Sequence, residues 1–165
     1  MIALENVLVP TDFGSASDTA LQYGRALAER FGARLHVLHV APDGFLTAAM
    51  GYGYASVPVS VQEEIELSAR KQLETLLTDE DRQALHARAI VVTHNAPAAA
   101  IIEYAKSNKI SLIVLGTHGR GALAHLFMGS VAERVVRLAP CPVLTVRHPE
   151  HEFVLPDALV AVSRA

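Results

Sequence analysis

Five short, strongly apolar segments alternate with longer amphipathic segments along this chain of 165 residues. The apolar segments are rich in valine, isoleucine and leucine, which is typical of strands buried on both faces of a sheet. The segments between them repeat apolar residues at helical spacing. The predicted strands are residues 6–10, 34–40, 87–93, 112–116 and 143–146, and predicted helices begin near residues 15, 61, 97 and 131. This alternation predicts one doubly wound parallel α/β sheet with helices on both faces.

Residues at the ends of the amphipathic segments support the predicted helices. Ser15 and Asp18 are three residues apart at the start of the first one, which is the spacing of a capping box. Gly32 follows its last apolar residue, where glycine commonly ends a helix. Pro97 is suited to the first turn of the third helix, because the N–H that proline lacks has no helical partner there. Residues 43–60 carry several glycines and predict a long loop.

The order of the strands decides where a ligand binds. Five-stranded sheets of this type mostly adopt the order 3-2-1-4-5 or the flavodoxin-like order 2-1-3-4-5. We expect the order 3-2-1-4-5. The glycines of this chain follow the fourth strand, whereas a flavodoxin-type FMN site would require them after the first strand. The winding then reverses between strands one and four, and ligands bind beyond the carboxyl ends of strands at such a reversal. Residues 10–12 and 116–119 therefore face one predicted crevice.

The chain after the fourth strand has the composition of an anion site. Gly116-Thr117-His118-Gly119 follows that strand, and Gly129-Ser130 precedes the last predicted helix. Glycine has no Cβ between a phosphate oxygen and the main chain. The start of a helix adds N–H groups and a partial positive charge. Together with the predicted crevice, these residues predict an anion-binding cleft.

Composition excludes several classes of partner. The formal net charge is −3, so clustered positive charge for nucleic acid is not expected. Uninterrupted apolar runs stay shorter than the roughly 18 residues that cross a bilayer, and the first residues do not resemble a signal peptide. The single cysteine excludes an internal disulfide and fits a reducing compartment. We therefore expect a cytoplasmic protein without membrane contact.

Three polar residues near the cleft have two interpretations each. Asp12 either offers acceptors to ribose hydroxyls or Mg²⁺ or caps the first helix, and we favour the ligand because the strand order places it at the crevice independently. His118 and Arg120 either reach a ligand or lie as exposed loop residues. Their residue types alone do not decide between these roles.

The eight histidines do not follow a metal-binding pattern. His36 and His39 are three residues apart on a strand, so they point to opposite faces of the sheet. His148 and His151 lack the further ligands that a structural metal site needs. Cys141 lies between two prolines and is interpreted as a packing residue. Since carboxylates do not pair as acid and base either, we expect neither a metal site nor a catalytic residue.

The pattern Gly116-x2-Gly119-x9-Gly129-Ser130 resembles the ATP-binding signature of the universal stress protein family. Residues 9–13, 130–135 and 139–144 resemble other characteristic segments of that family. The resemblance implies a nucleotide-binding domain at residues 1–148, of the adenine nucleotide alpha hydrolase-like type with strand order 3-2-1-4-5. Residues 149–165 would form a C-terminal extension. Asn95 and Ser111 stand where members of the family often have glycine and aspartate.

The resemblance also implies a ligand, ATP with or without Mg²⁺, and a set of residues that hold it. Pro10, Thr11 and Asp12 would approach the adenosine, and Val40 would contact adenine through its backbone. The ribose and phosphates would meet residues of the glycine pattern, namely Gly116, His118, Gly119, Gly129, Ser130 and Val131. Arg120 is a candidate for the γ-phosphate, because its guanidinium suits phosphate oxygens.

Functions of different classes are compatible with this sequence. The first is an ATP-binding regulatory module of the stress response, with at most slow hydrolysis, whose occupancy changes the surface offered to a protein partner. The resemblance implies a homodimer that pairs through the last strand, residues 143–146, a sheet edge rich in β-forming residues. The alternatives are a structural dimer or adaptor with a vestigial pocket, and an enzyme that cleaves ATP.

Overall fold

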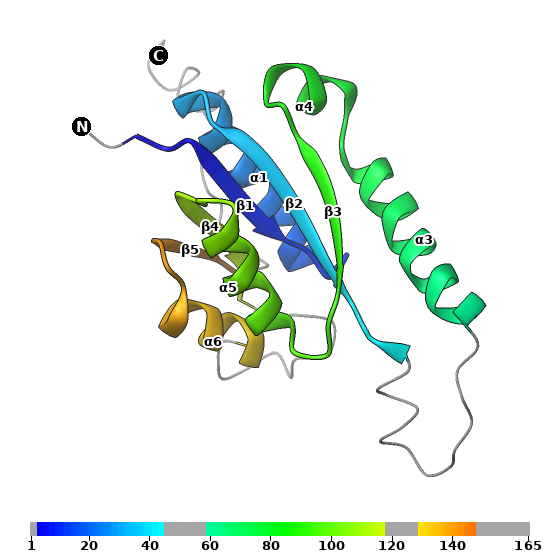
Figure 1. The fold of residues 1–165 in the computed structure, drawn as a ribbon. Coiled ribbons are helices and arrows are strands. Elements are labelled where there is room, and N and C mark those ends of the chain that lie inside the picture. Colours follow the sequence, from blue (N-terminus) through cyan, green and yellow to red (C-terminus); the bar gives the residue numbers. More distant parts are fainter. Residues whose placement is uncertain (1–2, 45–58, 118–128, 148–165) are drawn as a thin grey trace.

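The computed structural model describes residues 3–44, 59–117 and 129–147, and the description below concerns these residues. Five strands form one sheet (Figure 1). They are β1 (Asn6–Pro10), β2 (Arg34–Ala41), β3 (Arg88–Thr93), β4 (Leu112–Gly116) and β5 (Val143–Val146). All neighbouring strands are parallel, in the order β3-β2-β1-β4-β5. The predicted order 3-2-1-4-5 is confirmed, and the predicted strand ends differ from the observed ones by at most one residue.

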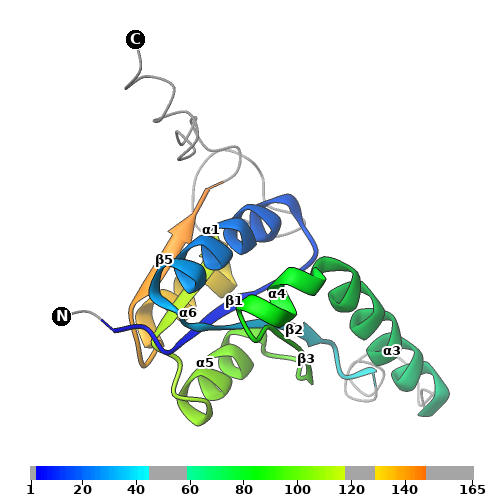
Figure 2. The ribbon, with the colours of Figure 1, turned by 90° about the horizontal axis from the view of Figure 1, so that it is seen from above.

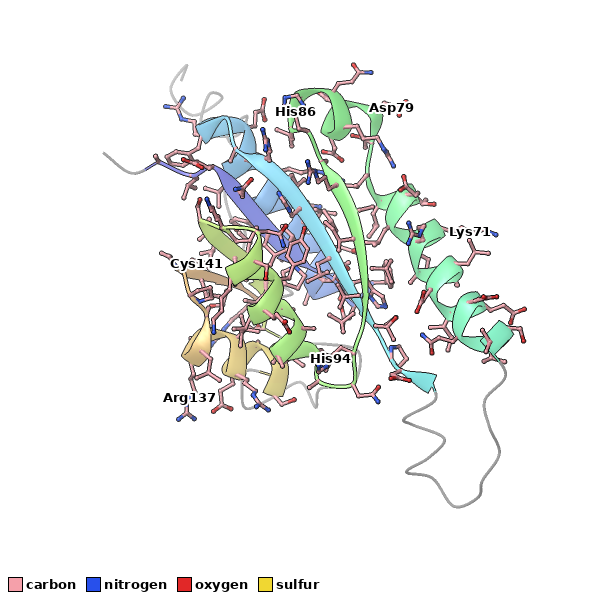
Figure 3. All side chains as sticks on the ribbon, in the orientation of Figure 1. Lys71, Asp79, His86, His94, Arg137 and Cys141 are labelled. Atoms are coloured by element: carbon pink, nitrogen blue, oxygen red, sulfur yellow. The ribbon has the colours of Figure 1, made fainter. Side chains whose placement is uncertain are left out.

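Helices cover both faces of the sheet, as the alternating pattern predicted. They are α1 (Ser15–Phe31), α3 (Val59–Leu76), α4 (Asp79–Ala84), α5 (Pro97–Ser107) and α6 (Ser130–Leu138). Figure 2 shows α1, α3 and α4 on one side of the sheet and α5 and α6 on the other. On α3, Lys71 projects away from the sheet (Figure 3).

The ends of α1 show one wrong prediction and one confirmed prediction. The predicted capping box of Ser15 and Asp18 is wrong, because the helix begins one residue earlier, with Gly14 as its N-cap. The Gly14 N–H is instead bound by the side chain of Ser17 at 3.2 Å. At the other end, Gly32 adopts the left-handed conformation, with φ of 64°, and ends the helix as predicted.

The short helix α4 was missed by the sequence analysis. Its six residues are mostly polar, so they carry no apolar stripe to detect. The available signal was Thr78 followed three residues later by Asp81, which form a capping box in the structure. Asp81 also accepts two hydrogen bonds from the Arg25 side chain of α1, at 2.9 and 2.8 Å. This ion pair attaches α4 to α1.

Two apolar clusters fill the space between the sheet and its helices. On the α1 side, strand residues such as Val7, Val9 and Leu35 are fully buried. On the α5 side, the cluster includes Leu8, Leu38 and Ile101 from β1, β2 and α5, together with residues of α6. The alternation of these residues along each strand explains why the strands are apolar throughout: both of their faces are covered.

Candidate functional site

A cavity of about 470 Å³ lies at the carboxyl ends of β1, β2 and β4, where the winding of the sheet reverses. This volume is within the range of about 300–1,000 Å³ that is usual for small-molecule sites. The lining residues are Pro10, Thr11, Asp12, Ser17, Leu38, His39, Val40, Pro97, Ile101, Leu115, Gly116, Thr117, Gly129, Ser130, Val131 and Ala132. The cavity therefore occupies the position at which a doubly wound sheet binds its ligand.

The structure brings most of the residues predicted for the site to this one cavity. Those that line it are Pro10, Thr11, Asp12, Val40, Gly116, Gly129, Ser130 and Val131. Asp12 and Ser130 are more than a hundred residues apart in the chain, yet both line this cavity. The three remaining residues, His118, Gly119 and Arg120, lie outside the described part of the chain.

Seven of the sixteen residues that line the cavity were missed by the sequence analysis. The missed residues are Ser17, Leu38, His39, Pro97, Ile101, Leu115 and Ala132. Some had a signal: Leu38 lies two residues before Val40, so the two side chains share a face of β2. Pro97 begins α5 directly after the carboxyl end of β3. Leu38, Val40, Pro97 and Ile101 together form an apolar wall suited to a flat ring system.

The first turn of α6 also lines the cavity. Helix N-termini leave N–H groups without intrahelical partners and carry a partial positive charge, so the turn from Ser130 to Ala132 is suited to an anion. Gly129 is the N-cap, and its own N–H donates to the carbonyl oxygen of Thr117 at 2.6 Å. This bond joins the end of β4 to the start of α6. The sequence analysis had counted Gly129 among the phosphate-binding residues without this internal role.

Gly116 also has an internal role that the sequence did not reveal. A Cβ at this position would lie 2.7 Å from the backbone carbon and 2.8 Å from the carbonyl oxygen of Ala16. Such distances are not tolerated, and backbone atoms cannot rotate away. The close packing of α1 against the end of β4 is therefore enough to require glycine here, before any ligand is considered.

Asp12 takes part in the turn before α1 and lines the cavity, but it does not cap the helix, whose N-cap is Gly14. Its Oδ1 accepts hydrogen bonds from the Gly14 N–H and the Ser17 hydroxyl, both at 3.0 Å, so it orders the turn before α1. The same residue lines the cavity. Phe13, which lies between Asp12 and Gly14 in the sequence, has a φ of 61°, which is uncommon for a non-glycine residue. Its N–H donates to the Thr11 hydroxyl at 3.0 Å, and its ring packs on His39 with centroids 4.4 Å apart.

A model of the universal stress protein family matches residues 3–147. The chain belongs to the universal stress protein family. Over 144 residues it is 31% identical to the universal stress protein YxiE of Bacillus subtilis, covering 86% of this chain and 97% of that protein.

Solved structures of universal stress proteins have the same fold. The structure of UspA from Lactobacillus plantarum matches with a TM-score of 0.69 and 25% identity, over 88% of this chain and 99% of that one. A universal stress protein from Archaeoglobus fulgidus, solved in complex with dAMP, matches with a TM-score of 0.59 and 18% identity, over 88% of this chain and 99% of that chain. At this identity the second match shows the fold alone.

In this universal stress protein, His36 and His39 contact neighbouring elements, and Cys141 is partly buried. His36 and His39 do point to opposite faces of β2: His36 Nδ1 lies 2.8 Å from the Tyr104 hydroxyl of α5, and His39 Nδ1 lies 2.9 Å from the Thr11 carbonyl oxygen. Within the described residues, His, Cys, Asp and Glu do not gather in groups of three that could hold a metal ion. Cys141 lies in the segment between α6 and β5 (Figure 3), and burial raises the pKa of its thiol.

Proposed function

We propose that this universal stress protein is a regulatory module that binds ATP in the cavity between β1 and β4. One observation carries the proposal: a single cavity is lined both by the apolar wall from β2 and α5 and by the start of α6. The apolar wall fits the adenine ring, and the α6 N-terminus fits the phosphates. Asp12, at the end of the intervening strand β1, lies between these two regions.

The proposed contacts follow the predicted residues. The Val40 backbone would meet adenine, Pro10 and Thr11 would border the adenosine, and Ser130 and Val131 would hold phosphates. His118, Gly119 and Arg120 stay predictions for the ribose and phosphates, as does a role for Mg²⁺. The dAMP complex of the Archaeoglobus fulgidus relative supports an adenine nucleotide as the ligand class.

The module would act through occupancy of the site, with slow hydrolysis at most. ATP bound between β1, β2 and α6 would order these elements together and change the surface offered to a protein partner. Turnover above about one ATP per minute, still slow beside the ~1–1,000 s⁻¹ of ordinary enzymes, would favour the hydrolase alternative.

Assembly and location remain part of the same proposal. The strand β5 is one edge of the sheet, and its Leu144 is 36% exposed. We propose that β5 pairs with β5 of a second copy, because exposed sheet edges are commonly paired or covered. The described helices include none that has both the length and the apolar character to span a bilayer. A cytoplasmic location is proposed from the composition.

The decisive experiment identifies and titrates the ligand. We expect purified protein to release an adenine nucleotide on denaturation, detected by mass spectrometry, and the emptied protein to bind ATP in calorimetry. The proposal would be contradicted if no nucleotide copurified and if ATP, ADP, AMP and cyclic AMP all gave no heat of binding. A melting temperature unmoved by all four nucleotides would instead favour the structural dimer.

Gly129→Val is the sharpest variant for this site. Its φ of −57° and ψ of 150° are open to valine, so the fold should tolerate the change. The branched side chain would stand at the start of α6, where the phosphates are proposed to lie. We expect ATP affinity to fall at least ~10-fold by calorimetry, with little change in melting temperature.

Ala139→Val is the matched control. Ala139 is the C-cap at the other end of α6, with nearly the same backbone angles of −61° and 144°. ATP affinity in this variant should equal that of the wild type. Equal affinities for the wild type and Gly129→Val would remove Gly129 from the site.

A further inference from the structure

The hydroxyl of Ser17 is the centre of a hydrogen-bond group between the end of β1 and the first turn of α1. Ser17 is 5% exposed and lines the cavity. Its Oγ lies 3.0 Å from Asp12 Oδ1, 3.0 Å from Thr11 Oγ1 and 2.8 Å from the Gly14 carbonyl oxygen. It also accepts the Gly14 N–H at 3.2 Å. One buried hydroxyl therefore contacts Thr11, Asp12 and Gly14 at once.

The acceptors available to each hydroxyl favour one direction for these bonds. Thr11 Oγ1 accepts the Phe13 N–H at 3.0 Å, so its own proton is available for Ser17 Oγ. Ser17 has one proton to donate, and an ionised carboxylate is a stronger acceptor than a neutral carbonyl oxygen. The consistent arrangement is a chain in which Thr11 donates to Ser17 and Ser17 donates to Asp12.

These hydrogen bonds from Thr11 through Ser17 hold the Asp12 carboxylate in one place before a ligand arrives. Oδ1 is bound by the Ser17 hydroxyl and the Gly14 N–H. Gly14 also packs against it, since a Cβ on this glycine would lie 3.0 Å from Oδ1. A carboxylate oriented in advance binds a ligand hydroxyl without the entropy cost of ordering its side chain.

The strand order indicates which part of a nucleotide meets Asp12. The apolar wall comes from β2 and α5, and the anion-binding turn follows β4. β1 lies between β2 and β4 in the sheet, so the residue at its end faces the part of the ligand between base and phosphates. That part is the ribose, whose hydroxyls are donors that a carboxylate accepts.

We propose that Ser17 and Thr11 are positioning residues, which orient the Asp12 carboxylate toward the ribose hydroxyls and so make the site selective for ribonucleotides. This inference rests on the proposed function and deepens it. Neither residue needs to touch the ligand for this role, because both act through Asp12.

The test compares ATP with 2′,3′-dideoxy-ATP, which has the same base and phosphates but no ribose hydroxyls. We expect the wild type to bind ATP at least ~10-fold more tightly by calorimetry, because the dideoxy analogue leaves the oriented carboxylate without its donors. If the wild type binds neither nucleotide, both the proposed function and this inference are wrong. If it binds both equally well, only the inference is wrong.

Ser17→Ala separates positioning from a structural role. We expect this variant to lose most of the preference, with ATP affinity falling ~5-fold or more and dideoxy-ATP affinity unchanged within ~2-fold. An equal loss for both ligands would mean that Ser17 merely supports the fold, and would overturn the inference. Ser15→Ala is the matched control, because Ser15 is exposed in the same turn of α1 and should keep the full preference.

A double variant shows whether Ser17 acts through Asp12. In an Asp12→Asn background, where the preference is already reduced, Ser17→Ala should change the ratio of affinities by less than ~2-fold. Independent effects of the two substitutions would contradict the proposed chain. Should Ser17→Ala fail to fold, Thr11→Val removes the first donor of the chain while keeping the side-chain shape. It should reduce the preference less than Asp12→Asn, and an unreduced preference would overturn the inference.

Discussion

The two faces of the sheet differ in how completely they are packed. On the α1 face, helix and strands approach so closely that Gly24 and Gly116 leave no room for a Cβ. On the α5 face, the apolar cluster continues into the cavity, and Leu38 and Ile101 belong to both. We therefore propose that the first face mainly stabilises the fold, whereas the second gives up some packing for the proposed ligand site.

A buried histidine shows the same contrast. His36 is 3% exposed on the α5 face. Among the described residues, its Nε2 is the buried side-chain nitrogen or oxygen that lacks a hydrogen-bond partner. On the α1 face, the buried Asp81 accepts bonds from both Arg25 and the Thr78 N–H. Because an unpaired buried polar atom costs free energy, the α5 face is the less optimised of the two.

Arg25→Met should produce the largest loss of stability. Burial alone would raise the pKa of Asp81, but the hydrogen bonds from Arg25 and Thr78 hold it below its usual value, so the carboxylate is charged at neutral pH. Removing Arg25 leaves this charge nearly buried, with a side chain 6% exposed. We expect the free energy of unfolding to fall by about 2–3 kcal/mol, less than for a fully buried pair because Arg25 is partly exposed.

The measurement is urea unfolding with and without ATP. If the faces divide their roles as described, ATP should bind the folded Arg25→Met protein with wild-type affinity and stabilise it by the same amount. Arg30→Met is the control, since Arg30 is exposed near the end of the same helix and should cost under about 0.5 kcal/mol. A large loss of ATP affinity in Arg25→Met would break the distinction between the faces.

Gly24→Ala should have the second largest effect. The added Cβ would lie 2.4 Å from Val9 Cγ2, on a strand residue that is fully buried. Overpacking of this kind costs about 1–3 kcal/mol, whereas alanine adds about 1 kcal/mol of helix propensity. We expect a net loss of up to about 2 kcal/mol in thermal or urea unfolding.

Removing the clashing atoms provides the control for Gly24→Ala. The double variant with Val9→Ala should be destabilised by less than the sum of the two single variants, because the added methyl fills part of the space that Val9 leaves. Strict additivity would show that close packing between α1 and β1 is not what requires glycine at position 24.

His36→Gln should have the smallest effect, and one that depends on pH. Burial lowers the pKa of His36, and the charges of Arg88 on β3 and Arg34 on its own strand lower it further. The other groups around it are the Tyr104 hydroxyl from α5 and the apolar Leu8 of β1. Since the folded protein favours neutral His36, its contribution to stability is complete above about pH 6.5 and declines as the pH falls toward the lowered pKa.

The expected result is a difference in slope between the two proteins. Glutamine keeps a hydrogen-bonding group for Tyr104 but does not titrate in this range. Between pH 7.5 and 5.5, the free energy of unfolding of the wild type should fall more steeply than that of His36→Gln, by up to about 1.4 kcal/mol per pH unit. Parallel stability curves would show that His36 is not the group responsible, and that its face is as tolerant of acid as the other.

Much of this fold was predictable because burial leaves a local trace in the sequence. The strands were predicted to within one residue, since each is apolar on both faces. Pro97 and Gly32 marked helix ends because their backbone restrictions are properties of single residues. α4 escaped prediction because its position depends on the Arg25–Asp81 ion pair, which joins residues far apart in the chain.

The site was predictable in the same graded way. Asp12 and Ser130 were placed at one crevice by the rule that relates strand order to ligand position, and both line the cavity. Ser17 was not foreseen, and neither was the bond from the Gly129 N–H to the Thr117 carbonyl oxygen, because both roles are hydrogen bonds between elements. Such bonds depend on distances between elements, which residue types do not specify.

By itself, the sequence determined the five strands, four of the described helices, the parallel strand order and the end of the sheet at which the cavity lies. These follow from apolar periodicity and from chain connectivity, both of which are visible along one dimension. Only the tertiary structure decided that Gly116 is a packing residue under Ala16, and that a hydroxyl of α1 holds Asp12. The physical reason is that steric clearance and hydrogen bonds are short-ranged, so they exist only once distant segments have been brought within a few ångströms of one another.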